Sequence, residues 1–261
     1  MKQRIVTGLI GGSIFLAILF LGGIYFHLSM FILAMVGIWE ITRMRNAHLF
    51  SPAHVFSLLL LIALFGQNVF AYNMLNGAGI IGAILLAMVI PVFTRNQTSF
   101  DEMAVAFLGA LYIGIGFYTL VLVRDEWGFL STLMVLLTVW ATDSGAYFTG
   151  SLFKGRGPKL WESISPKKTV IGAIGGTLLA VAIVIVLGPY TVAHLSISQQ
   201  ILLGIAIAVI GQIGDLAESA YKRTYNVKDS GTILPGHGGI LDRFDSIIFV
   251  FPAVYVLFLY I

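Results

Sequence analysis

The chain has 261 residues, of which 58% are hydrophobic and only 10% are charged, and its formal net charge is +3. Soluble domains have roughly 45–50% apolar and about 25% charged residues, so this composition excludes a water-soluble globular protein. The absence of cysteine excludes disulfides, cysteine-based zinc sites and thiol nucleophiles.

Apolar runs long enough to cross a hydrocarbon core about 30 Å thick recur along the whole chain. We therefore predict an all-α, polytopic integral membrane protein that forms one membrane-embedded domain. Residues 1–130 are expected to form a lipid-facing scaffold, and residues 131–261 to carry a catalytic site. The predicted spans are 5–24, 28–42, 55–71, 78–93, 104–123, 130–148, 169–187, 201–221 and 241–260.

The first predicted span follows Lys2 and Arg4 and could be a cleaved signal peptide or an uncleaved span. Its apolar run exceeds the roughly 7–15 residues of a signal-peptide core and lacks a small-residue cleavage pattern, which favours an uncleaved span. In the fourth span, Pro91 is expected to end the helix.

The basic residues fall on one side of this predicted topology. Of the 15 Lys and Arg residues, only Arg124 lies on the opposite side. The basic segments are the N-terminus, the loops 43–54, 94–103, 149–168 and 222–240, and Arg243 just beyond them. Because positively charged loops stay in the cytoplasm, we expect a cytoplasmic N-terminus, an external C-terminus and a location in the inner (plasma) membrane. Since the basic residues lie at membrane boundaries, no nucleic-acid partner is expected.

Acidic side chains lie within the predicted spans or at their cytoplasmic ends. They are Asp143, Asp215, Glu218, Asp242 and Asp245. Ionised groups in a membrane are energetically unfavourable and usually serve function. Asp215 and Glu218 share a helix face with Lys222, and Asp242 and Asp245 share a face of the next helix. The carboxylates could converge on a hard, oxygen-preferring cation such as Mg²⁺.

Structural ion pairs are the alternative explanation of these acids. Asp215 could pair with Lys222, and Asp242 with Arg243. Glu40, close in sequence to Arg43 and Arg45, is predicted to form only an interfacial ion pair.

A glycine-rich segment, Pro235-Gly236-His237-Gly238-Gly239, directly precedes the last span. Glycines allow a tight turn, and the helix N-terminus that follows adds partial positive charge, so the segment could cradle a phosphate. His237 could orient or protonate that phosphate, or only hydrogen-bond the turn. The cations close to it in sequence are Lys222, Arg223, Lys228 and Arg243.

A second basic segment, Ser163-Ile164-Ser165-Pro166-Lys167-Lys168-Thr169, opens the seventh span. Ser165 is predicted to cap the helix and Pro166 to lie in its first turn. Lys167 and Lys168 would then meet an anion at the helix start. The alternative is attraction to lipid headgroups.

Together these residues resemble the signature of CDP-diacylglycerol synthases (phosphatidate cytidylyltransferases). The resemblance covers residues 140–250, and Val170 and Ile171 depart from it where members commonly have an aromatic and an acidic or amide residue. The matching pattern is Ser219-x-x-Lys222-Arg223-x₄-Lys228-Asp229-x-Gly231, His237-Gly238-Gly239-x-x-Asp242-Arg243-x-Asp245, Asp143-Ser144-Gly145-Ala146-Tyr147-x-x-Gly150 and Ser165-Pro166-Lys167-Lys168-Thr169.

The resemblance implies that CTP and phosphatidic acid give CDP-diacylglycerol and pyrophosphate, with Mg²⁺, in phospholipid biosynthesis. The phosphatidate phosphate would attack the CTP α-phosphorus in line, and as an anion it needs no strong base. We assign the metal to Asp215 and Asp242, supported by Asp143 and Asp245, and a second cation could join it. The other assigned residues bind phosphates or assist catalysis: Lys167, Lys168, Lys222, Arg223, Lys228, Gly236, His237, Gly238, Gly239 and Arg243.

Three other functions remain open. A CTP-dependent kinase of polyprenol- or phytol-type lipid alcohols would release CDP instead of pyrophosphate. An ion-coupled transporter would show an inverted repeat and an outside-facing path of polar residues. No such repeat is visible in the sequence, and the polar residues are biased to the cytoplasmic side. A structural scaffold would leave the Lys, Asp, His and Gly cluster unexplained.

Glycine and alanine positions in the spans could also pack two chains as a homodimer.

Overall fold

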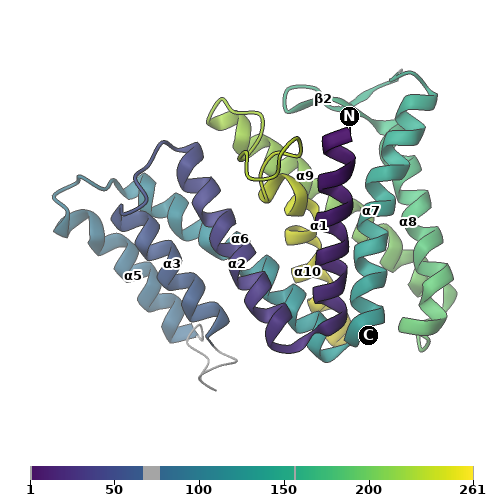
Figure 1. Cartoon of the computed structure of the whole chain (residues 1–261), viewed down its shortest axis with the longest axis horizontal. Helices are drawn as coiled ribbons and strands as arrows, with labels where there is room; N and C mark the ends of the chain where they lie inside the picture. Colours follow the sequence, from purple (N-terminus) through teal and green to yellow (C-terminus); the bar gives the residue numbers. More distant parts are fainter. Residues whose placement is uncertain (1, 67–76, 156, 261) are drawn as a thin grey trace. The chain divides into compact units, whose positions relative to one another are not determined.

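The computed structural model describes residues 2–66, 77–155 and 157–260. These residues are mostly helical, with one short hairpin, so the predicted all-α class is confirmed (Figure 1). The described helices are α1 Lys2–Leu21, α2 Gly23–Met44, α3 Pro52–Phe65, α5 Gly77–Phe93, α6 Phe100–Glu126, α7 Gly128–Leu152, α8 Val170–Thr191, α9 Ile197–Thr224 and α10 Leu241–Tyr260. The strands are β1 Lys159–Trp161 and β2 Ser165–Thr169.

Within the described ranges, six helices are long and apolar enough to cross a membrane: α2, α6, α7, α8, α9 and α10. Shorter apolar helices cover Val6–Leu21, Pro52–Phe65 and Gly77–Phe93. Each predicted span therefore coincides with a helix, and the protein is an all-α membrane protein. Residues 67–71 of the predicted third span, the loop to residue 76 and Arg156 lie outside the described residues.

The chain forms two compact units. The first consists of Met1–Val121 and Asp229–Asp242, and the second of Leu122–Lys228 and Arg243–Ile261. The scaffold role of residues 1–130 and the catalytic role of residues 131–261 stay predictions.

In the first unit, helices adjacent in sequence pack against one another. Gly22 and Gly23 have φ angles of 64° and 52°, which reverse the chain between α1 and α2. Helix α2 contacts α1 and α3, and α3 contacts α5 (Figure 1). Ser57 Oγ of α3 donates a hydrogen bond of 3.1 Å to the Ala106 carbonyl of α6. This unit buries large side chains that include Phe26 and Phe117.

The prediction that Pro91 ends the fourth span was wrong, because α5 continues to Phe93. The helix ends instead where Arg95 and Asn96 take left-handed φ angles of 51° and 60°. The Asn96 N–H returns to the Pro91 carbonyl at 2.8 Å. A left-handed C-terminus of this kind satisfies carbonyls that the last helical turn leaves unpaired.

In the second unit, glycines bring helices into close contact. Helix α8 packs against α7 and α9 (Figure 1). A Cβ built on Gly176 would lie 2.5 Å from the Thr142 carbonyl oxygen, and one on Gly214 would lie 2.7 Å from Phe249 Cβ. Small residues at such positions let membrane helices approach closely. The carboxylates on these helices are thereby brought near one another.

We expect Gly176→Ala to lower the free energy of unfolding by about 1–3 kcal/mol, because the new methyl group must displace the α7 backbone. The thermal unfolding midpoint of the detergent-solubilised protein measures this effect. Gly82→Ala is the matched control, since nothing lies within 4 Å of a Cβ on Gly82. Its midpoint should be unchanged or slightly raised, and equal midpoints for both variants would contradict the prediction.

The segment before α8 is a hairpin and not a capped helix start. Strands β1 and β2 pair antiparallel, with Lys159 opposite Thr169 and Trp161 opposite Ser165. The prediction of a helix beginning at Ser165 and Pro166 was wrong. Proline's fixed φ also suits extended chain at a sheet edge. The N-cap is Thr169, whose Oγ1 accepts a 3.1 Å hydrogen bond from the Gly172 N–H.

Candidate active site

A pocket of about 570 Å³ lies in the second unit, between α7, the hairpin, α8 and α9. Its acidic lining residues are Asp143 of α7 and Asp215 of α9. Its basic lining residues are Lys159, Lys167 and Lys168 of the hairpin. Carboxylates and ammonium groups therefore face the same space, which suits a phosphorylated ligand together with a cation.

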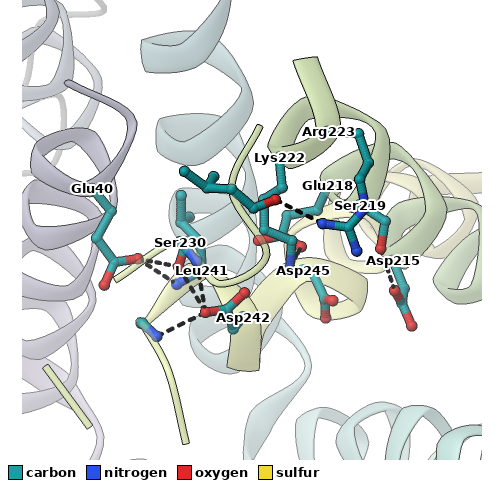
Figure 2. A network of polar contacts seen from close by, with 12 residues as sticks. Glu40, Asp215, Glu218, Ser219, Lys222, Arg223, Ser230, Leu241, Asp242 and Asp245 are labelled. Atoms are coloured by element: carbon teal, nitrogen blue, oxygen red, sulfur yellow. Dashed lines mark hydrogen bonds and ion pairs between the residues drawn. The ribbon is translucent and has the colours of Figure 1, made fainter. Parts of the chain in front are cut away.

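An ion pair joins the two sides of this pocket. Lys168 Nζ contacts Asp215 Oδ2, and each side chain is 28% exposed. Ser219 Oγ, one turn further along α9, donates a 3.3 Å hydrogen bond to Asp215 Oδ1 (Figure 2). Both oxygens of Asp215 thus have a partner, which orients the carboxylate within the pocket.

Further charged groups of the second unit interact with Asp215. Asp143 interacts electrostatically with Asp215, Lys168 and Arg243. Asp245 interacts with Asp215 and Asp143. Three of the four predicted metal ligands, from α7, α9 and α10, therefore lie close enough for their charges to interact, and metal binding by them stays a prediction.

The predicted cations at the end of α9 have partners within the chain. Lys222 forms an ion pair with Glu218, and both residues are buried. The alternative pairing of Lys222 with Asp215 is therefore wrong, since Asp215 pairs with Lys168. Arg223 Nη1 donates a 2.7 Å hydrogen bond to the Val227 carbonyl, and Lys228 is exposed. Phosphate binding by these cations stays a prediction.

The glycine-rich segment belongs to the first unit and forms a tight turn. Gly236 and Gly238 have φ angles of 76° and 86°, where a side chain would be strained. The His237 N–H donates to the Leu234 carbonyl at 2.9 Å. The His237 ring lies against α1, since a Cβ on Gly8 would lie 3.2 Å from its Nε2. Phosphate binding by this turn stays a prediction.

Asp242 accepts hydrogen bonds from the backbone around it. Its Oδ2 lies 2.8 Å from the Gly239 N–H and 2.8 Å from the Ser230 N–H. Asp242 lies in the first turn of α10, so the bond from Gly239 ties this turn to the segment that precedes the helix. Asp242 lies in the first unit and Asp215 in the second, so their convergence on one cation stays a prediction.

Glu40 is buried inside the first unit. Its side chain is 0% exposed, and it accepts hydrogen bonds from Ser230, Ile240 and Leu241 (Figure 2). The prediction that Glu40 forms an interfacial ion pair with Arg43 or Arg45 was wrong. The Arg43 guanidinium lies 5.2 Å from the Trp39 ring centroid, and Arg45 donates to the Glu102 carbonyl. The sequence feature that could have indicated a buried, hydrogen-bonded Glu40 is its position as a carboxylate inside an otherwise apolar run.

Whether this pocket can hold a divalent cation depends on how many of the cation's oxygen ligands come from bound phosphates and not from the protein. In the described part of the chain, no group of three or more His, Asp or Glu side chains is arranged as a metal-binding cluster. Mg²⁺ usually takes one or two protein carboxylates together with waters and substrate phosphates. Asp143 and Asp215 on the wall of one pocket meet that requirement. The residues fit Mg²⁺ that is held jointly by protein and phosphates.

Comparison with known proteins gives consistent matches over the whole chain. A sequence model described as the Cytidylyltransferase family matches residues 2–261. A protein named phosphatidate cytidylyltransferase from Bacillus subtilis (strain 168) is 38% identical over 263 residues, which cover 98% of this chain and 97% of that protein. Proteins of the same name from Staphylococcus epidermidis (strain ATCC 35984) and Staphylococcus saprophyticus are 38% and 36% identical, over 98% and 100% of both chains.

Proposed function

Because this chain belongs to the cytidylyltransferase family, we propose that it transfers the cytidylyl group of CTP to phosphatidic acid, giving CDP-diacylglycerol and pyrophosphate. The name of its full-length relatives supports this reaction. The helices long enough to cross a membrane suit a lipid substrate. The observation that carries the proposal is the pocket in which Lys167 and Lys168 face Asp143 and Asp215.

In this reaction an oxygen of the phosphatidate phosphate attacks the α-phosphorus of CTP. The bond between that phosphorus and the oxygen bridging to the β-phosphorus breaks, and pyrophosphate leaves with the bridging oxygen. The attacking phosphate is already an anion near neutral pH, so no side chain has to remove a proton. The protein's task is to hold two anions in line and to neutralise their charge.

Lys167 and Lys168 are placed to neutralise phosphate charge, since both line the pocket. Asp215, with Asp143 and Asp245 beside it, would hold Mg²⁺, and the sequence assigns Asp242 to the same ion. Bound Mg²⁺ would stabilise negative charge on the triphosphate and on the leaving pyrophosphate. Lys168 also contacts Asp215, so it keeps that carboxylate oriented.

The apolar helices and the bacterial relatives indicate a plasma-membrane protein. We propose that the pocket opens to the cytoplasm, because the hairpin that lines it belongs to the basic loop 149–168. CTP would then enter from the cytoplasm. Phosphatidic acid would enter from the inner leaflet.

The purified protein in detergent or liposomes should convert CTP and phosphatidic acid into equal amounts of CDP-diacylglycerol and pyrophosphate. EDTA should abolish both products, because the phosphates would lose their cation, and added Mg²⁺ should restore them. Thin-layer chromatography of the lipid and a coupled pyrophosphate assay measure the two products. Release of CDP in the presence of a polyprenol or phytol would instead identify a lipid-alcohol kinase. Absence of any CTP-dependent lipid product would refute both enzymatic functions.

A further inference from the structure

Glu40 is a buried carboxylate that receives hydrogen bonds from the segment at the start of α10. Its Oε1 accepts from the Ile240 N–H at 2.7 Å, and its Oε2 accepts from the Leu241 N–H at 2.9 Å. Oε2 also accepts from Ser230 Oγ at 2.8 Å (Figure 2). Glu40 lies on α2, about 190–201 positions away from these partners in the sequence. One side chain thus holds both ends of residues 230–241.

Ser230 links this carboxylate to Asp242. Its hydroxyl lies 2.8 Å from Glu40 Oε2 and 3.1 Å from Asp242 Oδ2, and its N–H donates to the same Asp242 oxygen at 2.8 Å. A hydroxyl has a single hydrogen, so the two carboxylates share one donor. The orientation of Asp242 therefore depends on where Glu40 holds Ser230.

Two glycines, which have no side chain, make room for the Glu40 carboxylate. A Cβ on Gly231 would lie 2.8 Å from Glu40 Oε1, and the three atoms nearest to it all belong to Glu40. A Cβ on Gly239 would overlap Ser230 Oγ and both Glu40 carboxylate oxygens. The segment thus fits this carboxylate at two glycines and at three hydrogen-bond donors. A charged group that only happened to be buried would not be matched at so many points.

We propose that Glu40 is a positioning residue, which orients Asp242 by holding Ser230 and the first amides of α10. This role rests on the proposed function, because Asp242 is assigned to the reaction there. Glu40 touches neither substrate in this scheme. It acts through Ser230 and the backbone of residues 239–241.

Glu40→Gln tests the proposal while preserving the size of the side chain. The amide offers one acceptor where the carboxylate offers two, and its NH₂ group faces donors, so the segment should loosen. Hydrogen exchange of the peptide spanning residues 229–242 should accelerate roughly tenfold or more. The kcat should fall about 10–100-fold, the usual loss when a group supporting a catalytic ligand is removed. The KM for CTP should change less than about threefold, because Glu40 binds no substrate.

Glu102→Gln is the matched control. Glu102 lies in the same unit, and its Oε2 accepts a 2.8 Å hydrogen bond from the Ser99 N–H at the start of α6. It is a half-buried helix-capping carboxylate, and this hydrogen bond stays within residues 99–102. In the Glu102→Gln variant, the kcat and the hydrogen exchange of residues 229–242 should both match those of the wild type.

Gly231→Ala provides a second test that does not depend on the stability of one variant. Alone, it should lower kcat and accelerate exchange of the same peptide, because its methyl group displaces Glu40. Combined with Glu40→Ala, it should add less than about twofold to the effect of Glu40→Ala, since the obstructing carboxylate is gone. Independent, multiplicative effects of the two substitutions would overturn the proposal.

Wild-type kcat and wild-type exchange in Glu40→Gln would also overturn it, as would a kcat loss that only follows the folded fraction. If Glu40→Gln does not fold, Glu40→Asp keeps the charge and should show accelerated exchange confined to residues 229–242. The exchange measurements need no substrate. A wild-type protein without CDP-diacylglycerol synthesis would therefore refute the proposed function and still decide whether Glu40 holds this segment.

Discussion

Asp215→Asn should lower the rate of CDP-diacylglycerol synthesis by about 10²–10³-fold, the loss expected when a group stabilising developing charge is removed. Asp215 lines the pocket, pairs with Lys168 and interacts with Asp143 and Asp245. Asparagine keeps the shape and the hydrogen bond from Ser219 but removes the negative charge. The measurement is kcat for pyrophosphate release at saturating CTP and phosphatidate, over a range of Mg²⁺ concentrations.

The Mg²⁺ concentration for half-maximal activity should also rise in Asp215→Asn, because the ion loses a ligand. Glu126→Gln is the control, an acid of the same unit whose Oε1 accepts a 3.3 Å hydrogen bond from Tyr255 and which lines no part of the pocket. Its activity should equal that of the wild type. If Asp215→Asn retained full activity with unchanged Mg²⁺ dependence, Asp215 would have no part in metal binding.

Lys168→Met should lower kcat/KM for CTP by roughly 10–100-fold, the value of one hydrogen bond to a charged group. Lys168 lines the pocket from β2, and its ammonium is the cation that contacts Asp215. Initial rates at varied CTP concentration measure the effect. Lys154→Met removes an exposed lysine near the end of α7 that does not line the pocket, and it should behave as the wild type.

The double variant Lys168→Met/Asp215→Asn tests whether the two groups act as a pair. Each single substitution already breaks their ion pair, so the combined loss should be smaller than the product of the single losses. The structure places both groups on one pocket and in contact. Losses that multiply would mean that the contact has no role in the reaction.

The helices could be predicted from sequence because each is long, apolar and bounded by local signals. The nine predicted spans coincide with the described helices, and the errors lie at their ends. Pro91 is inside α5, and Ser165 to Thr169 form a strand. A strand of five residues beside a basic turn gives too short a pattern to distinguish it from a capped helix start.

Part of the candidate site could be predicted on the same basis. Asp143, Asp215 and Asp245 stand out as acids in apolar helices, and the lysines before α8 stand out as paired cations. Their mutual contacts could not be predicted. Lys168 of β2 pairs with Asp215 of α9, a contact between separate segments, whereas Lys222 pairs with Glu218 at the i,i+4 helical spacing.

The amino-acid sequence by itself determined the helical membrane class and the residue types of the candidate site, because hydrophobic period and charge are properties of local segments. Only the tertiary structure decided the burial and the hydrogen-bond partners of Glu40, which lie about 190–201 positions away along the chain. A buried carboxylate is stable only with donors around it, and no local pattern records which distant backbone amides will supply them.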